Sequence, residues 1–160
     1  MEPASSSTYP ASDSLMSGLV EASFAVLRAE AAPSLGRVCE LLAGISIGAK
    51  VDGERFGIVF TRAHASCVAE PLVPKARLIT DRAAILEVID GHASLAGAVW
   101  SGRIEIVADV DTLARLFDGL AAYVLGVVRA RSSGALLGNL RQQARLVSSR
   151  EEMRRQTMEE

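Results

Sequence analysis

Hydrophobic residues recur every three or four positions near the start of the chain, after a first segment without a regular pattern. Residues 1–14 are rich in Ser, Pro and Ala, which favours a flexible segment. Residues 15–31 carry the helical spacing. Pro33 can open a second helix in its first turn, and Gly44 is suited to end that helix. Two helices are therefore predicted before residue 45.

Alternation of apolar and polar residues then replaces the helical spacing. Residues 45–51 and 54–62 have the pattern of two strands, and the Asp52-Gly53 pair between them is typical of a tight hairpin turn. Two more strands are predicted over residues 66–69 and 76–80. The alternation favours an antiparallel meander with at least one buried face.

Helical and extended patterns follow each other again in the second half. Asp81 can cap a helix that ends at Asp90-Gly91, and residues 102–109 return to alternation. The next predicted helix, residues 111–131, has more apolar residues than the single stripe of a surface helix. From residue 132 the pattern is weakly helical. Its possible apolar seam consists of Leu136, Leu137, Leu140, Ala144 and Val147.

Four segments follow one another in this second half: ILEVIDG (85–91), LAGAV (95–99), GRIEIVAD (102–109) and LARLFDGL (113–120). In that order they resemble the second half of a sterol-carrier-protein-2 (SCP2) domain. That family has a helix that ends in Gly, an apolar segment, a Gly-Lys-Ile type strand that ends in Gly-Asp, and a leucine-rich helix. Ala108 stands where the family commonly has Gly. The resemblance extends over residues 44–124 and is strongest after Ala76.

The resemblance implies an α+β fold, in which helices cover a mixed five-stranded sheet and enclose an apolar tunnel. It implies an SCP2-like domain over residues 15–131, which includes the N-terminal helices, and a C-terminal helical extension over residues 132–160. The expected function is to bind, and to transfer or present, a hydrophobic small molecule such as a sterol, fatty acyl chain, quinone or polyketide. No cofactor is expected.

The residue pattern offers walls for such a tunnel. Phe56, Ile58 and Phe60 share one face of a predicted strand, and an apolar helix face lies in the segment 117–124. The same residues could also interdigitate as a closed core, because every core has alternating strands and apolar helix stripes. The expected ligand-binding residues are Phe56, Ile58, Phe60, Ile89, Val99, Trp100, Phe117, Leu120, Tyr123 and Val124.

Two other functions remain open at this point. An enzyme or biosynthetic accessory protein could use the same cavity, with His64, Tyr123 or a carboxylate in acid-base work. However, neither His64 nor His92 has an acid or a nucleophile at motif spacing, so no catalytic residue is assigned. Alternatively, the seam from Leu136 to Val147 could pair with a second copy, which would make the chain a dimerisation or scaffold module.

Composition narrows the possible partners. The net charge is -2 and aromatic residues make up 4% of the chain, which argues against nucleic acid as a partner. Cys39 and Cys67 lack the spacing of a metal site, and we expect free thiols in a cytoplasmic protein. Arginines after residue 128 could contact a membrane surface or a partner enzyme.

Overall fold

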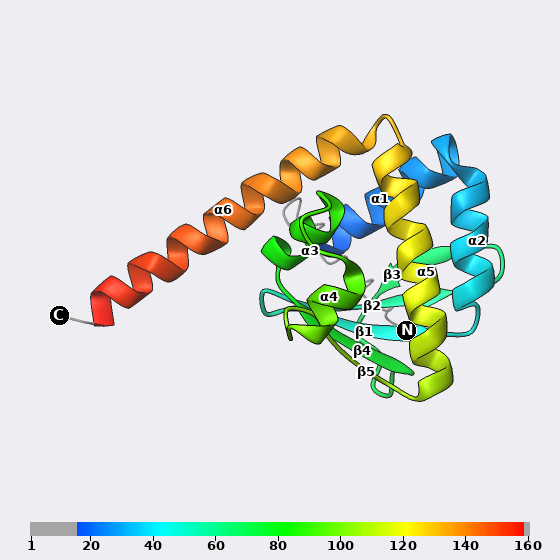
Figure 1. The fold of residues 1–160 in the computed structure, drawn as a ribbon, viewed down its shortest axis with the longest axis horizontal. Coiled ribbons are helices and arrows are strands. Elements are labelled where there is room, and N and C mark those ends of the chain that lie inside the picture. The colour runs from blue at the N-terminus through cyan, green and yellow to red at the C-terminus, as the bar shows by residue number, and fades with distance from the viewer. Residues whose placement is uncertain (1–15, 159–160) are drawn as a thin grey trace, which may run out of the picture.

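Helices cover one face of a five-stranded sheet in the computed structural model, which describes residues 16–158 (Figure 1). The flexible segment expected over residues 1–14 lies outside the described residues. The α+β class and the mixed five-stranded sheet are confirmed. The helices are α1 (Met16–Glu30), α2 (Ala32–Leu42), α3 (Arg82–Ile89), α4 (Leu95–Trp100), α5 (Val110–Arg129) and α6 (Ser133–Met158). The strands are β1 (Ser46–Val51), β2 (Glu54–Phe60), β3 (Ala65–Val68), β4 (Ala76–Thr80) and β5 (Glu105–Ala108).

Local sequence signals account for several element boundaries. Asp52 and Gly53 join β1 to β2 with φ angles of 49° and 83°, the left-handed values that a tight hairpin turn needs. The Asp81 carboxylate caps α3 by accepting a hydrogen bond from the Ala84 amide at 2.7 Å. The Asp109 carboxylate does the same for α5, where it accepts from the Thr112 amide at 2.9 Å. The predicted hairpin and the Asp81 cap are confirmed.

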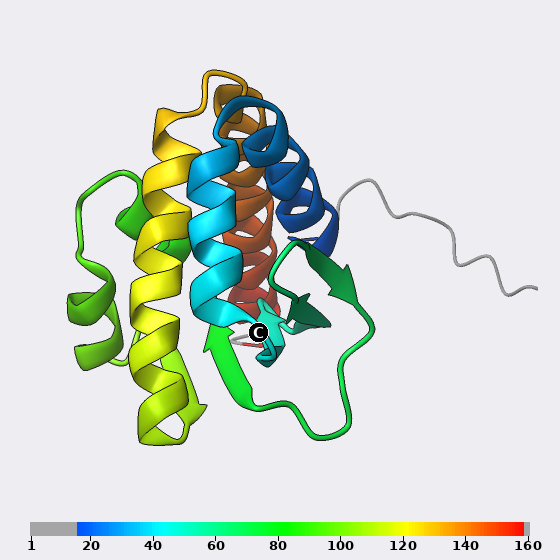
Figure 2. The same cartoon turned by 90° about the vertical axis from the view of Figure 1, so that its right-hand side faces the viewer.

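The sheet has the order β3-β2-β1-β4-β5, so the predicted meander is right for β1, β2 and β3 but wrong for β4. Strand β4 lies parallel to β1 because the connection from β3 crosses the outer face of the sheet (Figure 2). Pro71 and Pro74 of that connection lie against Gly57 and Gly48. A Cβ atom at Gly57 would come within 2.7 Å of Pro71 Cδ, so the crossing needs glycine there. The alternation of apolar and polar residues predicts which side chains share a face of a strand, but it does not predict which strand pairs with it.

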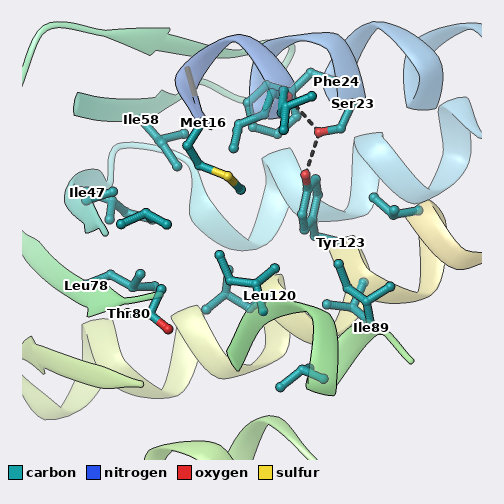
Figure 3. A pocket seen from close by; sticks show the side chains of 18 of the residues that line it. Met16, Ser23, Phe24, Ile47, Ile58, Leu78, Thr80, Ile89, Leu120 and Tyr123 are labelled. Atoms are coloured by element: carbon teal, nitrogen blue, oxygen red, sulfur yellow. Dashed lines mark hydrogen bonds between the residues drawn. The ribbon is translucent and has the colours of Figure 1, made fainter. Parts of the chain in front are cut away.

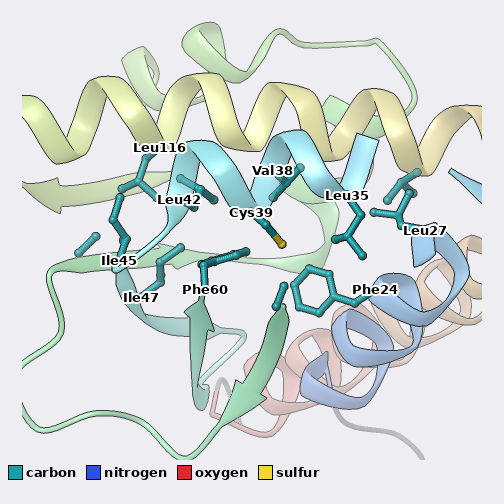
Figure 4. Packing of buried hydrophobic residues seen from close by; sticks show 13 residues of the cluster. Phe24, Leu27, Leu35, Val38, Cys39, Leu42, Ile45, Ile47, Phe60 and Leu116 are labelled. Carbon is teal, nitrogen blue, oxygen red and sulfur yellow. The ribbon is translucent and has the colours of Figure 1, made fainter. Parts of the chain in front are cut away.

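Helices α2 and α5 lie side by side over the sheet (Figure 2). Their contact is close because α5 has glycine at position 119, where a Cβ atom would come within 2.5 Å of the Leu42 side chain. Beneath them, buried side chains of α2 point toward Phe24 of α1 and Phe60 of β2 (Figure 4). The rings of Phe24 and Phe60 meet edge to face, with centroids 6.1 Å apart. This core is continuous with the cavity described below, because Phe24 and Phe60 also line that cavity.

The chain ends in a single 26-residue helix where the sequence predicts only weak helicity. Leu140, in the first half of α6, packs against Met16 and Phe56. From Ser148 to Met158 every residue is exposed, and this second half extends beyond the rest of the fold (Figure 1). Helix α6 is therefore part of the core at one end and free of it at the other.

Candidate ligand cavity

A cavity of about 170 Å³ lies between the sheet and the helices, and residues from each of the helices α1 to α6 line it (Figure 3). Its walls are aliphatic and aromatic, and no charged side chain is among the described residues that line it. An engineered apolar cavity of about 150 Å³ is large enough to bind benzene. The space here can therefore hold a ring or a short alkyl segment.

The floor of the cavity comes from the alternation in β1 and β2. Ile47 pairs with Ile58 and Ala49 pairs with Phe56 across the two strands. Side chains two residues apart point to the same side of a sheet, so these pairs and Phe60 all face the helices. Strand β4 adds Leu78 beside them. The floor is thus made by three neighbouring strands.

Helix α5 forms one wall through residues on a single face. Leu120, Tyr123, Val124 and Val127 follow each other at helical spacing and all line the cavity. The α5 residues Leu125 and Val128, which are each 55% exposed, belong to a different face. One helix thus separates the cavity from the surroundings.

The first half of α6 covers the cavity on another side. Leu136, Leu137 and Leu140 line it, so this part of the apolar seam faces the protein's own interior. Polar contacts hold the helix in place. The Glu30 carboxylate accepts hydrogen bonds from the Ser132 amide and hydroxyl, which lowers the Glu30 pKa, and Arg141 forms an ion pair with Asp90 at 2.6 Å.

A buried arginine joins three elements at the rim of the cavity. The Arg82 guanidinium contacts Asp52 at 2.8 Å and Glu54 at 3.2 Å, and it donates to the Gln143 side chain of α6 at 3.0 Å. Glu54 in turn accepts from the Met16 and Ser17 amides, at the first turn of α1. The arginine is only 7% exposed, so its carboxylate partners stabilise a charge that water barely reaches. This network fixes α1, α3 and α6 to the β1–β2 hairpin.

One pair of hydroxyl groups interrupts the apolar lining. Ser23 Oγ and Tyr123 Oη lie 2.5 Å apart, and both residues line the cavity (Figure 3). The Tyr123 ring also meets Phe24 edge to face at 5.8 Å. Burial raises the pKa of Tyr123 to about 12, although its hydrogen bond with Ser23 works in the opposite direction. The phenol is therefore neutral throughout the physiological range.

The structure brings most of the expected ligand-binding residues together and leaves three apart. Val99 packs on Ala98 and Ile104, Phe117 is half-buried outside the lining, and Trp100 is 94% exposed at the end of α4. Residues 95–100 form the helix α4, which was not predicted from their pattern, and this helix buries Ala98 while Trp100 points to solvent. The expected residues that line the cavity are Phe56, Ile58, Phe60, Ile89, Leu120, Tyr123 and Val124.

Other titratable candidates lie outside the cavity lining. His64 is exposed, 3.5 Å from the Arg28 guanidinium, and His92 is exposed after α3. Cys39 and Cys67 are free thiols, and burial raises the Cys67 pKa to about 12. Within residues 16–158 no cluster of His, Cys, Asp and Glu could hold a metal ion.

Sequence reasoning missed the cavity residues of α1 and α6. Met16, Val20 and Ser23 of α1 line the space, together with the leucines of α6. The seam at Leu136, Leu137 and Leu140 was visible in the sequence, but the sequence did not indicate which part of the protein it packs against. Ser23 gave no signal, because a serine within an apolar stripe resembles an exposed position.

Solved structures of other proteins share this fold. One is described as "UbiJ-SCP2 Ubiquinone synthesis protein": it is 19% identical, with a TM-score of 0.53 over 70% of this chain and 94% of that one. The chain has the SCP2 fold. A crystal structure of sterol carrier protein 2 is similar as well, at 16% identity, with a TM-score of 0.50 over 71% of this chain and 96% of that one.

The SCP2 fold is shown by structure rather than by sequence. The sequence matches no protein-family model and no curated protein. The likeness therefore concerns the fold, to which the sequence resemblance over residues 44–124 also pointed. Among the helices between residues 16 and 158, none has the length and apolar character needed to cross a membrane.

Proposed function

We propose that this protein binds an uncharged hydrophobic small molecule in the cavity between its sheet and helices. The observation that carries the proposal is a cavity of about 170 Å³ whose described lining contains no charged side chain. Burial of apolar area in such a space contributes roughly 25 cal/mol per Å², before the cost of ordering the ligand. The solved structures of similar fold are named for a sterol and for ubiquinone synthesis, and both molecules are hydrophobic.

The cavity suits a part of such a molecule better than the whole. Pockets for drug-sized ligands usually measure ~300–1,000 Å³. A sterol or a long acyl chain would need more space than the 170 Å³ found here. The cover that has to move is α6, because its leucines line the cavity and its second half is exposed. Displacement of α6 would also give the protein a way to pass its ligand to an enzyme or a membrane in the cytoplasm.

The decisive experiment is native mass spectrometry of the gently purified protein, followed by solvent extraction and uptake of added propylbenzene. We expect a hydrophobic adduct, or stoichiometric uptake of the probe. Val124→Phe should abolish it, because the larger ring occupies the cavity.

The matched control is Val128→Phe on the same helix. Val128 is 55% exposed and does not line the cavity, so this variant should keep the wild-type affinity. Equal uptake by both variants would show that the probe binds elsewhere. No adduct and no uptake by the wild-type protein would mean that the interior is closed to ligands, and the proposal would fail.

A further inference from the structure

The hydroxyl pair in the cavity has a fixed direction of hydrogen bonding. Ser23 Oγ donates its proton to the Val20 carbonyl at 2.6 Å, within α1. That proton is therefore not available to Tyr123, whose Oη lies 2.5 Å from Ser23 Oγ. The contact then requires the Tyr123 hydroxyl to donate and Ser23 to accept. Both protons of the pair are committed to protein acceptors.

What remains for a ligand is an acceptor. Tyr123 Oη keeps its lone pairs after it donates to Ser23. A ligand O–H or N–H group can donate to that oxygen without breaking any bond of the protein. A ligand carbonyl or ether would need the Tyr123 proton, and its binding would cost the bond to Ser23.

The rest of the lining does not favour a charged ligand. Thr80 is the other hydroxyl among the described lining residues, and its Oγ1 donates to the Arg103 carbonyl at 3.1 Å. No described lining residue carries a positive charge that would pair with a carboxylate. Moving an unpaired carboxylate into such a space is strongly unfavourable.

We infer that the cavity selects neutral ligands that carry a hydroxyl group, such as an alcohol, a phenol or a hydroquinone, through donation to Tyr123 Oη. Ligands of the same shape that end in a carboxylate or a carbonyl are disfavoured. This inference rests on the proposed function, because it assigns a ligand class to the same cavity. Tyr123 and Ser23 together act as its specificity-determining pair.

The test compares small ligands of one shape by calorimetric titration at pH 7. The ligands are propylbenzene, 4-propylphenol, 4-propylacetophenone and 4-propylbenzoate, offered to the wild-type protein and to Tyr123→Phe. We expect Tyr123→Phe to weaken 4-propylphenol binding at least about threefold more than it changes propylbenzene binding. The benzoate should bind neither protein.

Two further variants separate the hydrogen bond from a general change in the cavity. Ser23→Ala releases the Tyr123 proton, so the affinity for 4-propylacetophenone should rise relative to the wild-type protein. A purely structural role of Ser23 would not produce that gain. Thr80→Val removes the other hydroxyl of the lining and should leave the preference for 4-propylphenol intact.

The outcomes distinguish this inference from the proposal on which it rests. If propylbenzene binds but Tyr123→Phe weakens 4-propylphenol no more than Thr80→Val does, the hydroxyl selection is wrong and the ligand cavity stands. Wild-type binding of the benzoate as tight as that of the phenol would also overturn the selection. If no ligand of the series binds the wild-type protein, both fail.

Discussion

Two neighbouring faces of α5 are packed differently: one lies in close contact with α2, and the other borders the cavity. On one face Gly119 lets α2 come so close that a single added carbon would clash with Leu42. On the other face Leu120, Tyr123 and Val124 border a cavity. Both faces are hydrophobic, so composition does not separate them. The difference lies in what holds the opposite element. Gly119 lets α2 approach and Arg115 of α5 donates to the carbonyls at the end of α2, whereas the Arg82 network and the Arg141–Asp90 pair position α1, α3 and α6.

Removal of the rim network should produce the largest effect. We expect Arg82→Met to lower the free energy of unfolding by about 3–5 kcal/mol, because Asp52 and Glu54 would lose the cation that they surround. Urea unfolding followed by circular dichroism measures this change.

The matched control is Arg37→Met, which removes an arginine that is 63% exposed and whose ion-pair partner Glu40 is 68% exposed. An exposed pair contributes about 0–1 kcal/mol, so little change is expected. Similar effects of the two substitutions would show that the buried network does not anchor the rim.

A smaller effect is expected on the close-packed face of α5. Gly119→Ala should lower the free energy of unfolding by about 1–3 kcal/mol, because the new methyl group would overlap the Leu42 side chain. Thermal and urea unfolding both report it. Gly119 itself lies outside the cavity lining, but Leu42 belongs to it, so a shift of the Leu42 side chain should also change the affinity for a cavity ligand.

Gly138→Ala is the counterpart in α6. Nothing lies within 4 Å of a Cβ atom at that position, so the helix preference of alanine should stabilise the protein by up to about 1 kcal/mol. A loss of stability in Gly119→Ala no greater than in Gly138→Ala would contradict the close packing of α5 on α2.

Titration of Tyr123 tests the environment of the cavity face. Tyr9→Phe leaves Tyr123 as the single tyrosine, and its ultraviolet absorbance should show a pKa near 12 in the folded protein, compared with about 10 in urea. Because the folded-state pKa is the higher one, this contribution to stability is complete below pH 10. It is lost as the pH rises toward 12. A folded-state pKa near 10 would place the phenol in contact with water.

The smallest effect concerns the only tryptophan. Trp100 is 94% exposed and does not line the cavity, so its fluorescence should resemble that of tryptophan in water. A cavity ligand should leave the emission unchanged. A shift of the emission on ligand binding would mean that Trp100 does contact the ligand, as predicted from the sequence.

The sequence predicted the features that depend on neighbouring residues. The Asp52-Gly53 turn, the Asp81 cap and the inward faces of β2 and α5 follow from spacing and residue type within one segment. Other features depend on residues far apart in the chain. These are the parallel pairing of β4 with β1 and the hydrogen bond between Ser23 and Tyr123. Arg82 illustrates the limit, because an arginine at a helix start resembles a surface residue until its carboxylate partners are placed around it.

A local sequence pattern likewise cannot distinguish a cavity from a filled core. Both have alternating strands and apolar helix stripes, and they differ only in the distance between layers. Here that distance is set by contacts outside the apolar faces, among them the Arg141–Asp90 pair and the Glu30 hydrogen bonds to Ser132. Residue spacing alone did not decide between a tunnel and a closed core, and the tunnel was expected because of the SCP2 resemblance.

The exposed second half of α6 has a consequence for handling the protein. From Ser148 to Met158 every residue of the helix is exposed, so this part of the helix should open locally at little cost in free energy. Trypsin should therefore cut first after Arg150, Arg154 or Arg155, while Leu140 and the cavity lining stay intact. The same segment is the natural place for an affinity tag or a fluorescent label, since a group attached there stays clear of the ligand.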